Sequence, residues 1–248
     1  MRSLLIAPAD EQWFAEALES GADAIIVDLA ATALAKRSAA RAAAARFLKA
    51  ARGRGGGPVL IVRANALNSG ETDADLDAVM ASGPDAILLP LSLGAPSVQQ
   101  LSAKLAVREA LLGLADGATR IIAVADTAQS LFHMGSYRGS SARLMGVAWS
   151  AEALRADIGA ESTRDRLGDR LGAYGLAREL TLLAAASARV AAIDTAFPDI
   201  RDLAGLRAEA LAARRDGFTA KIALDPAQVG VINDVFPLRF LPLAKGRP

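Results

Sequence analysis

The chain of 248 residues contains no cysteine and a single histidine, His133. Without cysteine, disulfides, thiolate nucleophiles and cysteine-ligated metals are excluded, and nothing in the chain requires an oxidising compartment. One isolated imidazole does not build a histidine metal centre, so we expect His133 to be a surface or packing residue. A cytoplasmic location is therefore expected.

An excess of one charge is also missing, because 28 Lys and Arg face 27 Asp and Glu and give a net charge of +1. No dense stripe of basic residues is interleaved with aromatics, as a nucleic-acid surface requires. Long apolar runs are absent as well. The run at the amino terminus is interrupted by Pro8 and Asp10, and no later run could span a bilayer. We therefore expect neither a nucleic-acid partner nor a membrane.

Short apolar runs are abundant instead, since 52% of the residues are hydrophobic. Eight runs are apolar on successive residues, which is typical of strands buried on both faces. They alternate with eight segments of helical spacing. The apolar runs cover 3–8, 24–29, 59–65, 86–92, 120–126, 143–149, 189–195 and 221–226. The helical segments cover 10–20, 36–52, 72–82, 97–113, 128–134, 174–187, 203–216 and 226–236.

This strict alternation predicts right-handed crossovers between the strands of a parallel sheet. Eight such units in a chain of this length are what a closed barrel needs, and the chain is long enough to bury one large core. We therefore expect residues 1–248 to form a single domain of the α/β class, a (β/α)₈ TIM barrel. An open doubly wound sheet is the alternative.

In this fold, catalytic groups lie at the carboxyl ends of the strands and in the loops that follow. Carboxylates at these positions suit a hard cation such as Mg²⁺, and a guanidinium suits a substrate carboxylate. The alternative for each residue is a buried network of ion pairs that closes the barrel mouth. The candidates are Asp28, Arg63, Asn65, Ser92, Asp126, Trp149, Ser150, Glu152, Asp194, Thr195 and Asp225.

Several segments, from near residue 2 to near residue 234, resemble the HpcH/HpaI aldolase and citrate lyase beta-subunit family. They read RSLLIAPAD, SGADAIIVDL, IVRANAL, GPDAILLP, ADTA, LMGVAWSAEALRADIGA, AAIDTAFPDIRDLAGLRAEA and GFTAKIALDPAQVGVIN. The resemblance implies a TIM barrel, usually a homo-oligomer, in which Mg²⁺ or Mn²⁺ helps to make or break a carbon–carbon bond beside a carbonyl. It also implies a small-molecule substrate, either a short 2-keto acid or an acyl-CoA thioester such as citryl-CoA or malyl-CoA. Cleaving such a bond leaves an enolate, whose oxyanion a Lewis acid stabilises.

The resemblance also assigns residues. Asp126, in the phrase DTA, matches a metal-binding glutamate of the family, and Arg63 matches the arginine that holds the substrate. These two are the expected catalytic residues. Asp28 and Ser150 are expected to contribute to substrate binding together with Arg63.

A second metal-binding carboxylate of the family is replaced here by Ala153, in the phrase AEAL. The neighbouring Glu152 could join Asp126 as a metal ligand, although one step along the chain turns its side chain to another face. The alternative, which we favour, is a first-turn acid at the start of a helix that Ser150 caps. The Mg²⁺ or Mn²⁺ that the resemblance implies would therefore lack one of the carboxylates that the family supplies.

Other polar positions of the family are also changed in this chain. They lie after the second, fourth and eighth predicted strands, and they are Ala30, Ala31, Leu91 and Asp225. We expect Asp225 to pair with Lys221 or Arg63, or to bind substrate. The carboxyl end is shorter than the family's usual tail, so a lid over the site, where one exists, is expected from a partner subunit.

Three functions remain open at this point. The first, ranked ahead, is a carbon–carbon lyase with an altered site, in which Asp126, waters and substrate complete the metal shell. The second is a barrel that has lost catalysis and serves as a binding or assembly subunit. The third is metal-independent chemistry with Arg63 as the electrophilic group and Asp126 or Glu152 as base, which would need a carboxyl pKa raised by burial.

Overall fold

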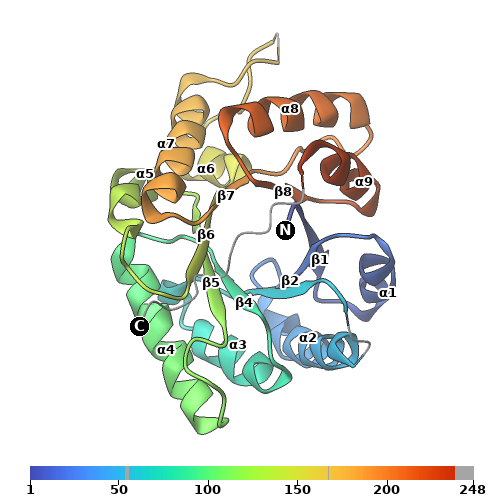
Figure 1. Ribbon diagram of the computed structural model, residues 1–248, viewed down its shortest axis with the longest axis vertical. Helices are drawn as coiled ribbons and strands as arrows, with labels where there is room; N and C mark the ends of the chain where they lie inside the picture. Colours follow the sequence, from blue (N-terminus) through green and yellow to red (C-terminus); the bar gives the residue numbers. More distant parts are fainter. Residues whose placement is uncertain (54–55, 167, 238–248) are drawn as a thin grey trace.

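The computed structural model describes residues 1–53, 56–166 and 168–237. Its centre is a closed barrel of parallel strands, in which each strand pairs with the next along the chain and β8 pairs with β1 (Figure 1). The strands are β1 (Ser3–Pro8), β2 (Ala24–Asp28), β3 (Val59–Arg63), β4 (Ala86–Leu89), β5 (Arg120–Ala125), β6 (Leu144–Trp149), β7 (Ala191–Asp194) and β8 (Ala220–Ala223). The prediction of a (β/α)₈ barrel is confirmed, and the open sheet is wrong.

Helices surround the barrel and follow each strand (Figure 1). The α-helices are α1 (Glu11–Glu19), α2 (Arg37–Arg52), α3 (Thr72–Val79), α4 (Ala95–Leu111), α5 (Ala128–His133), α6 (Ala151–Ile158), α7 (Gly172–Ala188), α8 (Leu203–Asp216) and α9 (Pro226–Val235). Short 3₁₀ helices are η1 (Leu34–Lys36), η2 (Leu67–Ser69), η3 (Met80–Ser82) and η4 (Met134–Tyr137). The connection from β6 to β7 holds two helices. The short α6 begins directly after β6, and α7 then returns along the barrel wall.

The core has two layers, which explains why the strands are apolar on successive residues. The inner layer fills the barrel and includes Leu4, Ile26 and Ile193. The outer layer lies between strands and helices, where alanines such as Ala44 let α2 pack closely on the sheet. Since alternate side chains of a strand point to opposite faces, each strand serves both layers.

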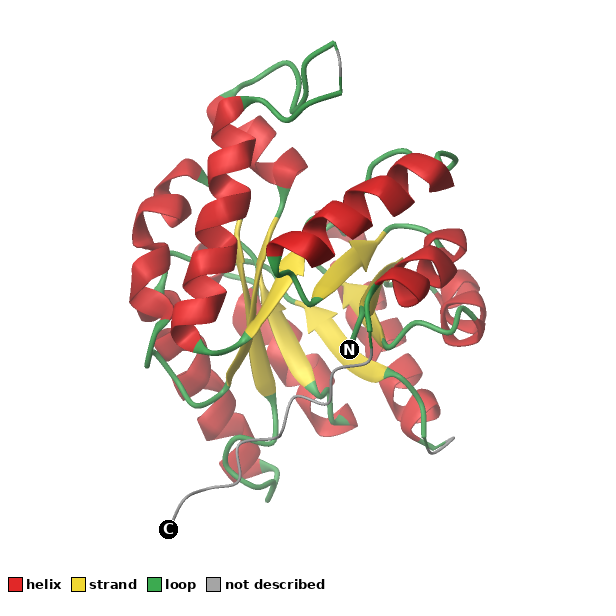
Figure 2. Cartoon of the chain, turned by 45° about the horizontal axis from the view of Figure 1, so that its top comes forward, coloured by secondary structure: helices red, strands yellow, loops and turns green. Residues whose placement is uncertain are grey.

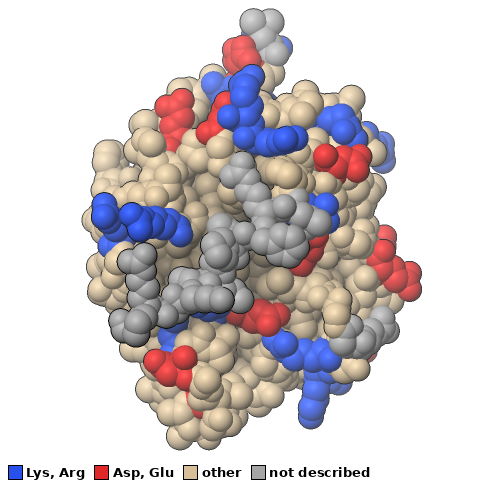
Figure 3. Space-filling model, in the orientation of Figure 1, with Lys and Arg blue, Asp and Glu red and all other residues tan. Residues whose placement is uncertain are grey.

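The strands all run in one direction, so their carboxyl ends meet at one end of the barrel (Figure 2). This end is where the candidates of the sequence analysis converge. Lys and Arg side chains are interspersed with Asp and Glu on the face shown in Figure 3. Within the described residues, no helix is both long and apolar enough to cross a membrane.

Candidate active site

A cavity of about 170 Å³ opens at the carboxyl ends of the strands. Its polar lining residues are Arg63, Asp126, Trp149, Ser150, Glu152 and Thr195. The fold therefore brings six of the sequence candidates to one cavity, and Asp28 joins them through its ion pair with Arg63.

Asp126 follows directly after β5, and its side chain is only 1% exposed. One carboxylate oxygen accepts a hydrogen bond of 2.9 Å from the backbone N–H of Leu91. Burial raises the pKa of Asp126 to about 6, although the Leu91 N–H and the positive charge of Arg63 act in the opposite direction. A carboxyl group with this pKa can exchange protons near neutral pH.

Leu91, which holds Asp126 through its N–H, has an unusual backbone conformation. Its φ is +51°, in the left-handed region that a leucine rarely adopts. Strained conformations of this kind persist where the surrounding structure imposes them, and they cluster at functional sites. The contact therefore ties the β4 loop to the carboxylate at the end of β5.

Arg63 ends β3 and reaches across to the end of β2. Its Nη1 lies 3.1 Å from Oδ2 of the buried Asp28. The other oxygen of Asp28 accepts the backbone N–H groups of Ala30 and Ala31, at 2.9 and 3.1 Å. The Arg63 side chain is 29% exposed, so a guanidinium with donors to spare faces the cavity.

At the end of β6, Ser150 is the N-cap of α6 and accepts a hydrogen bond of 3.2 Å from the Ala153 N–H. Glu152 lies in the first turn, is 57% exposed and pairs with Arg155 at 2.8 Å. The interpretation of Ser150 as a cap and Glu152 as a first-turn acid is confirmed. The backbone N–H of Ala151 donates to the Thr195 hydroxyl at 3.1 Å, which joins the ends of β6 and β7.

Asp194 belongs to a buried network of polar side chains in the layer between the strands and the helices. Trp149 Nε1 donates to it at 3.0 Å, and Lys221 Nζ lies 2.8 Å from its second oxygen. Lys221 also contacts Glu209 of α8 at 2.7 Å. Burial opposes ionisation of Asp194, yet the Lys221 ammonium holds its pKa below the usual value. Asp194 is thus a structural ion-pair partner.

The prediction that Asp225 pairs with Lys221 is wrong, because Asp194 and Glu209 take that ammonium. Asp225 is instead the N-cap of α9, and its Oδ1 accepts the Ala227 N–H at 2.8 Å. An aspartate followed by proline is a helix-start signal, so the sequence did contain the pattern that identifies this cap.

Two further candidates and the histidine lie away from the cavity. Asn65 is held by Asp75, which accepts its backbone and side-chain N–H groups at 2.7 and 2.8 Å. Ser92 is fully buried, and its carbonyl accepts the Tyr137 hydroxyl at 3.3 Å. His133 is exposed on α5, as expected, with Nδ1 2.8 Å from the Gln129 carbonyl.

The apolar part of the lining was not recognisable from the sequence. Side chains of the inner barrel layer and of the loops after β7 and β8 form this wall, namely Ile6, Leu88, Val124, Ala196, Pro198, Ile222 and Leu224. The successive apolar residues predicted strands buried on both faces, but no pattern in the sequence indicated which core residues end at the cavity.

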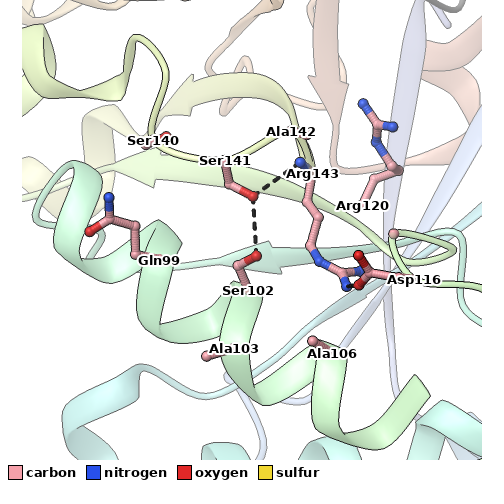
Figure 4. A pocket seen from close by; sticks show the side chains of 11 residues that line it. Gln99, Ser102, Ala103, Ala106, Asp116, Arg120, Ser140, Ser141, Ala142 and Arg143 are labelled. Atoms are coloured by element: carbon pink, nitrogen blue, oxygen red, sulfur yellow. Dashed lines mark hydrogen bonds and ion pairs between the residues drawn. The ribbon is translucent and has the colours of Figure 1, made fainter. Parts of the chain in front are cut away.

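A larger cavity, of about 550 Å³, lies at the opposite end of the barrel, beside α4 and the starts of β5 and β6. Figure 4 shows Ser102 facing Ser141, and Arg143 beside Asp116. Arg143 is also held by the buried Glu109 at 2.6 Å. The central polar groups of this larger cavity already bind one another. The cavity also lies at the end of the barrel whose loops serve stability in this fold. We therefore place the candidate site at the smaller cavity.

The side chains at the smaller cavity do not form a preassembled site for Mg²⁺ or Mn²⁺. Asp126 and Glu152 are its lining carboxylates, and Glu152 is committed to Arg155 while one oxygen of Asp126 is committed to Leu91. Nowhere in the described parts of the chain do three or more His, Asp or Glu side chains form a group that could hold a metal ion. The expectation about a partner-supplied lid concerns residues 238–248, which lie outside the described residues.

Known proteins that are similar to this chain in sequence and in structure point to one family. The HpcH/HpaI aldolase/citrate lyase family model matches residues 2–226. The citrate lyase subunit beta of Leuconostoc mesenteroides subsp. cremoris is 30% identical over 217 residues, which are 87% of this chain and 70% of the relative. The citrate lyase subunit beta of Escherichia coli K12 is 30% identical over 71% of this chain, and the match spans 57% of its own length.

Solved structures extend the similarity to the whole barrel. The citrate lyase beta subunit of Mycobacterium tuberculosis, complexed with oxaloacetate and magnesium, superposes with a TM-score of 0.79 at 27% identity. The superposition covers 95% of this chain and 96% of the mycobacterial chain.

Proposed function

The chain belongs to the HpcH/HpaI aldolase/citrate lyase family, and on that premise we propose that it makes or breaks a carbon–carbon bond beside a carbonyl, through an enolate. The substrate class is a short 2-keto acid or an acyl-CoA thioester such as citryl-CoA or malyl-CoA. The observation that carries the proposal is that the buried carboxyl group of Asp126 and the guanidinium of Arg63 line the same cavity.

Arg63 and Asp126 supply complementary chemistry. In the cleavage direction, ionised Asp126 accepts the proton of the hydroxyl on the carbon that leaves, and the electron pair of the broken bond forms the enolate. Arg63 donates hydrogen bonds to the carboxylate and the enolate oxygen, where negative charge develops. Asp126 then returns the proton to the enolate carbon.

The mycobacterial citrate lyase beta subunit is complexed with oxaloacetate and magnesium. In this chain Ala153 stands where the family resemblance places a second carboxylate, and Glu152 is held by Arg155. The donor set around Asp126 therefore does not match a resident divalent cation. The proposed mechanism consequently assigns proton transfer and charge stabilisation to Asp126 and Arg63.

Solvent exchange tests the proposal most directly. Enolate formation exchanges the C3 protons of a 2-keto acid with water, so we expect the protein to catalyse deuterium incorporation into pyruvate or 2-oxobutanoate in D₂O. The measurement is the loss of the C3 proton signal by NMR, against a buffer blank. Absence of exchange with every 2-keto acid and with acetyl-CoA, with or without added Mg²⁺, would reject the lyase and favour a binding or assembly subunit.

Arg63→Lys is expected to reduce the exchange rate at subsaturating keto acid by about 10- to 100-fold. A lysine keeps the charge beside Asp28 but loses the planar fork that grips a carboxylate through two hydrogen bonds. The matched control is Arg52→Lys, at an ion pair with Asp85 at the other end of the barrel. Equal exchange by both variants would remove Arg63 from the mechanism.

We also propose that the chain forms a homo-oligomer in the cytoplasm. The family resemblance supports the homo-oligomer, and the lack of cysteine, which leaves nothing that requires an oxidising compartment, supports the location. Light scattering coupled to size-exclusion chromatography tests the first, and a mass of one chain at micromolar concentration would contradict it.

A further inference from the structure

The cavity is small and its wall is largely apolar. At about 170 Å³ it is smaller than the roughly 300–1,000 Å³ that is typical of pockets for small molecules. Ile6, Leu88, Val124 and Ile222 line it from the inner barrel layer, and Leu224 lines it from the rim. A ligand group enclosed here is therefore short, and it contacts hydrocarbon over most of its surface.

The cavity also has an uneven distribution of charge. Arg63 is the one cation among its lining residues, and Nη1 of that guanidinium is already shared with Asp28. Two carboxylates, Asp126 and Glu152, line the same space. One ligand carboxylate can pair with Arg63. A second would find no cation among the lining residues, only the neutral hydroxyls of Ser150 and Thr195, hydrocarbon and like charges, so its desolvation would cost binding free energy.

We propose that this cavity selects a monocarboxylic 2-keto acid with a short apolar tail over a dicarboxylic acid of the same size. The ligand carboxylate and keto oxygen lie at Arg63, and the tail lies against Leu88, Val124 and Ile222. The inference rests on the proposed function, because it takes Arg63 as the group that holds the substrate.

A pair of isosteric ligands tests the selection. Oxaloacetate and 4-methyl-2-oxopentanoate have equal numbers of non-hydrogen atoms. Oxaloacetate ends in a carboxylate where 4-methyl-2-oxopentanoate has an isopropyl group. We expect the unmodified protein to bind the isopropyl compound at least about tenfold more tightly, in ligand-observed NMR titrations with freshly prepared oxaloacetate. Equal affinities, with or without added Mg²⁺, would overturn the proposal.

Leu224→Lys provides a second test at the rim of the cavity. Leu224 follows β8 and is 41% exposed, so a lysine there can keep its ammonium in water and its stem on the wall. This variant adds the second cation that the cavity lacks, and we expect oxaloacetate to bind about tenfold more tightly. Leu224→Met, of similar size and without charge, is the matched control and is expected to keep the original preference. Unchanged oxaloacetate affinity in a folded Leu224→Lys protein would contradict the proposal.

Deuterium exchange separates this inference from the proposed function. A preference for the apolar ligand without exchange would support the ligand class and reject the lyase. Exchange with equal affinity for both ligands would support the lyase and overturn the ligand class.

Discussion

Asp126→Asn is expected to slow deuterium exchange by about 100-fold or more, which is the range that a positioned acid–base group contributes. The amide cannot accept the proton that leaves the substrate. Its oxygen can still accept the Leu91 N–H, so the loop after β4 should keep its place. The measurement is the NMR exchange rate at saturating 2-oxobutanoate. A loss of less than threefold would show that another group moves the proton.

The same substitution is expected to stabilise the fold at neutral pH. The pKa of Asp126 in the folded protein is about 6, against an ordinary value of 3.8, so the folded state binds the proton more tightly than the unfolded state. The contribution of this group to the free energy of unfolding is therefore greatest below about pH 4. As the pH rises through about 6, that contribution falls by about 3 kcal/mol. The loss is complete at about pH 7, one unit above the pKa of the folded state.

Asp126→Asn should remove this part of the pH dependence and unfold at higher urea concentration than the parent protein at pH 7. Urea unfolding between pH 4 and pH 7.5 measures both effects. The control is Asp77→Asn, whose side chain is 68% exposed in a surface ion pair, and which we expect to change stability by less than about 0.5 kcal/mol. A parent protein and an Asp126→Asn variant with parallel pH profiles would contradict the buried, proton-binding carboxyl group.

Lys221→Met is expected to destabilise the protein by about 3–5 kcal/mol, because it leaves a fully buried carboxylate without its nearest counter-ion. Both Lys221 and Asp194 have no exposed surface, and Nζ of the lysine lies 2.8 Å from the aspartate. After the substitution Asp194 retains the Trp149 N–H at 3.0 Å, while Arg178 lies 3.9 Å away. Chemical unfolding at pH 7 gives the change in free energy.

The double substitution Lys221→Met, Asp194→Asn is the control, since it removes both charges and should recover a large part of the loss. Arg207→Met breaks an exposed ion pair with Asp234 and is expected to cost less than about 1 kcal/mol. A Lys221→Met protein as stable as Arg207→Met would show that the buried network stabilises the protein no more than an exposed ion pair does.

The barrel could be predicted because its signals are local. Apolar runs on successive residues indicate strands buried on both faces, and their alternation with helical segments leaves few topologies. The same argument placed Asp28, Arg63 and Asp126 at one end of the barrel, because parallel strands end together. The short helix after β6, with Ser150 as its cap, could also be anticipated from residue type and position.

The hydrogen-bond and ion-pair partner of each side chain could not be predicted in the same way. Asp225 and Asp194 both end apolar runs, yet one caps α9 and the other binds Lys221 across neighbouring strands. The difference depends on the register between β7 and β8, which pairs Asp194 with Lys221, and on Glu209 of α8 lying over them. Residue order along the chain does not contain these distances.

The sequence by itself therefore determined the barrel, the end of the barrel that holds the site, and the absence of thiol and multi-histidine chemistry, because periodicity and residue type decide these. Only the tertiary structure decided the size of the cavity, its single cation and the raised pKa of Asp126. Those properties arise from burial and from contacts between strands far apart in sequence, and desolvation of a carboxylate depends on every side chain that surrounds it.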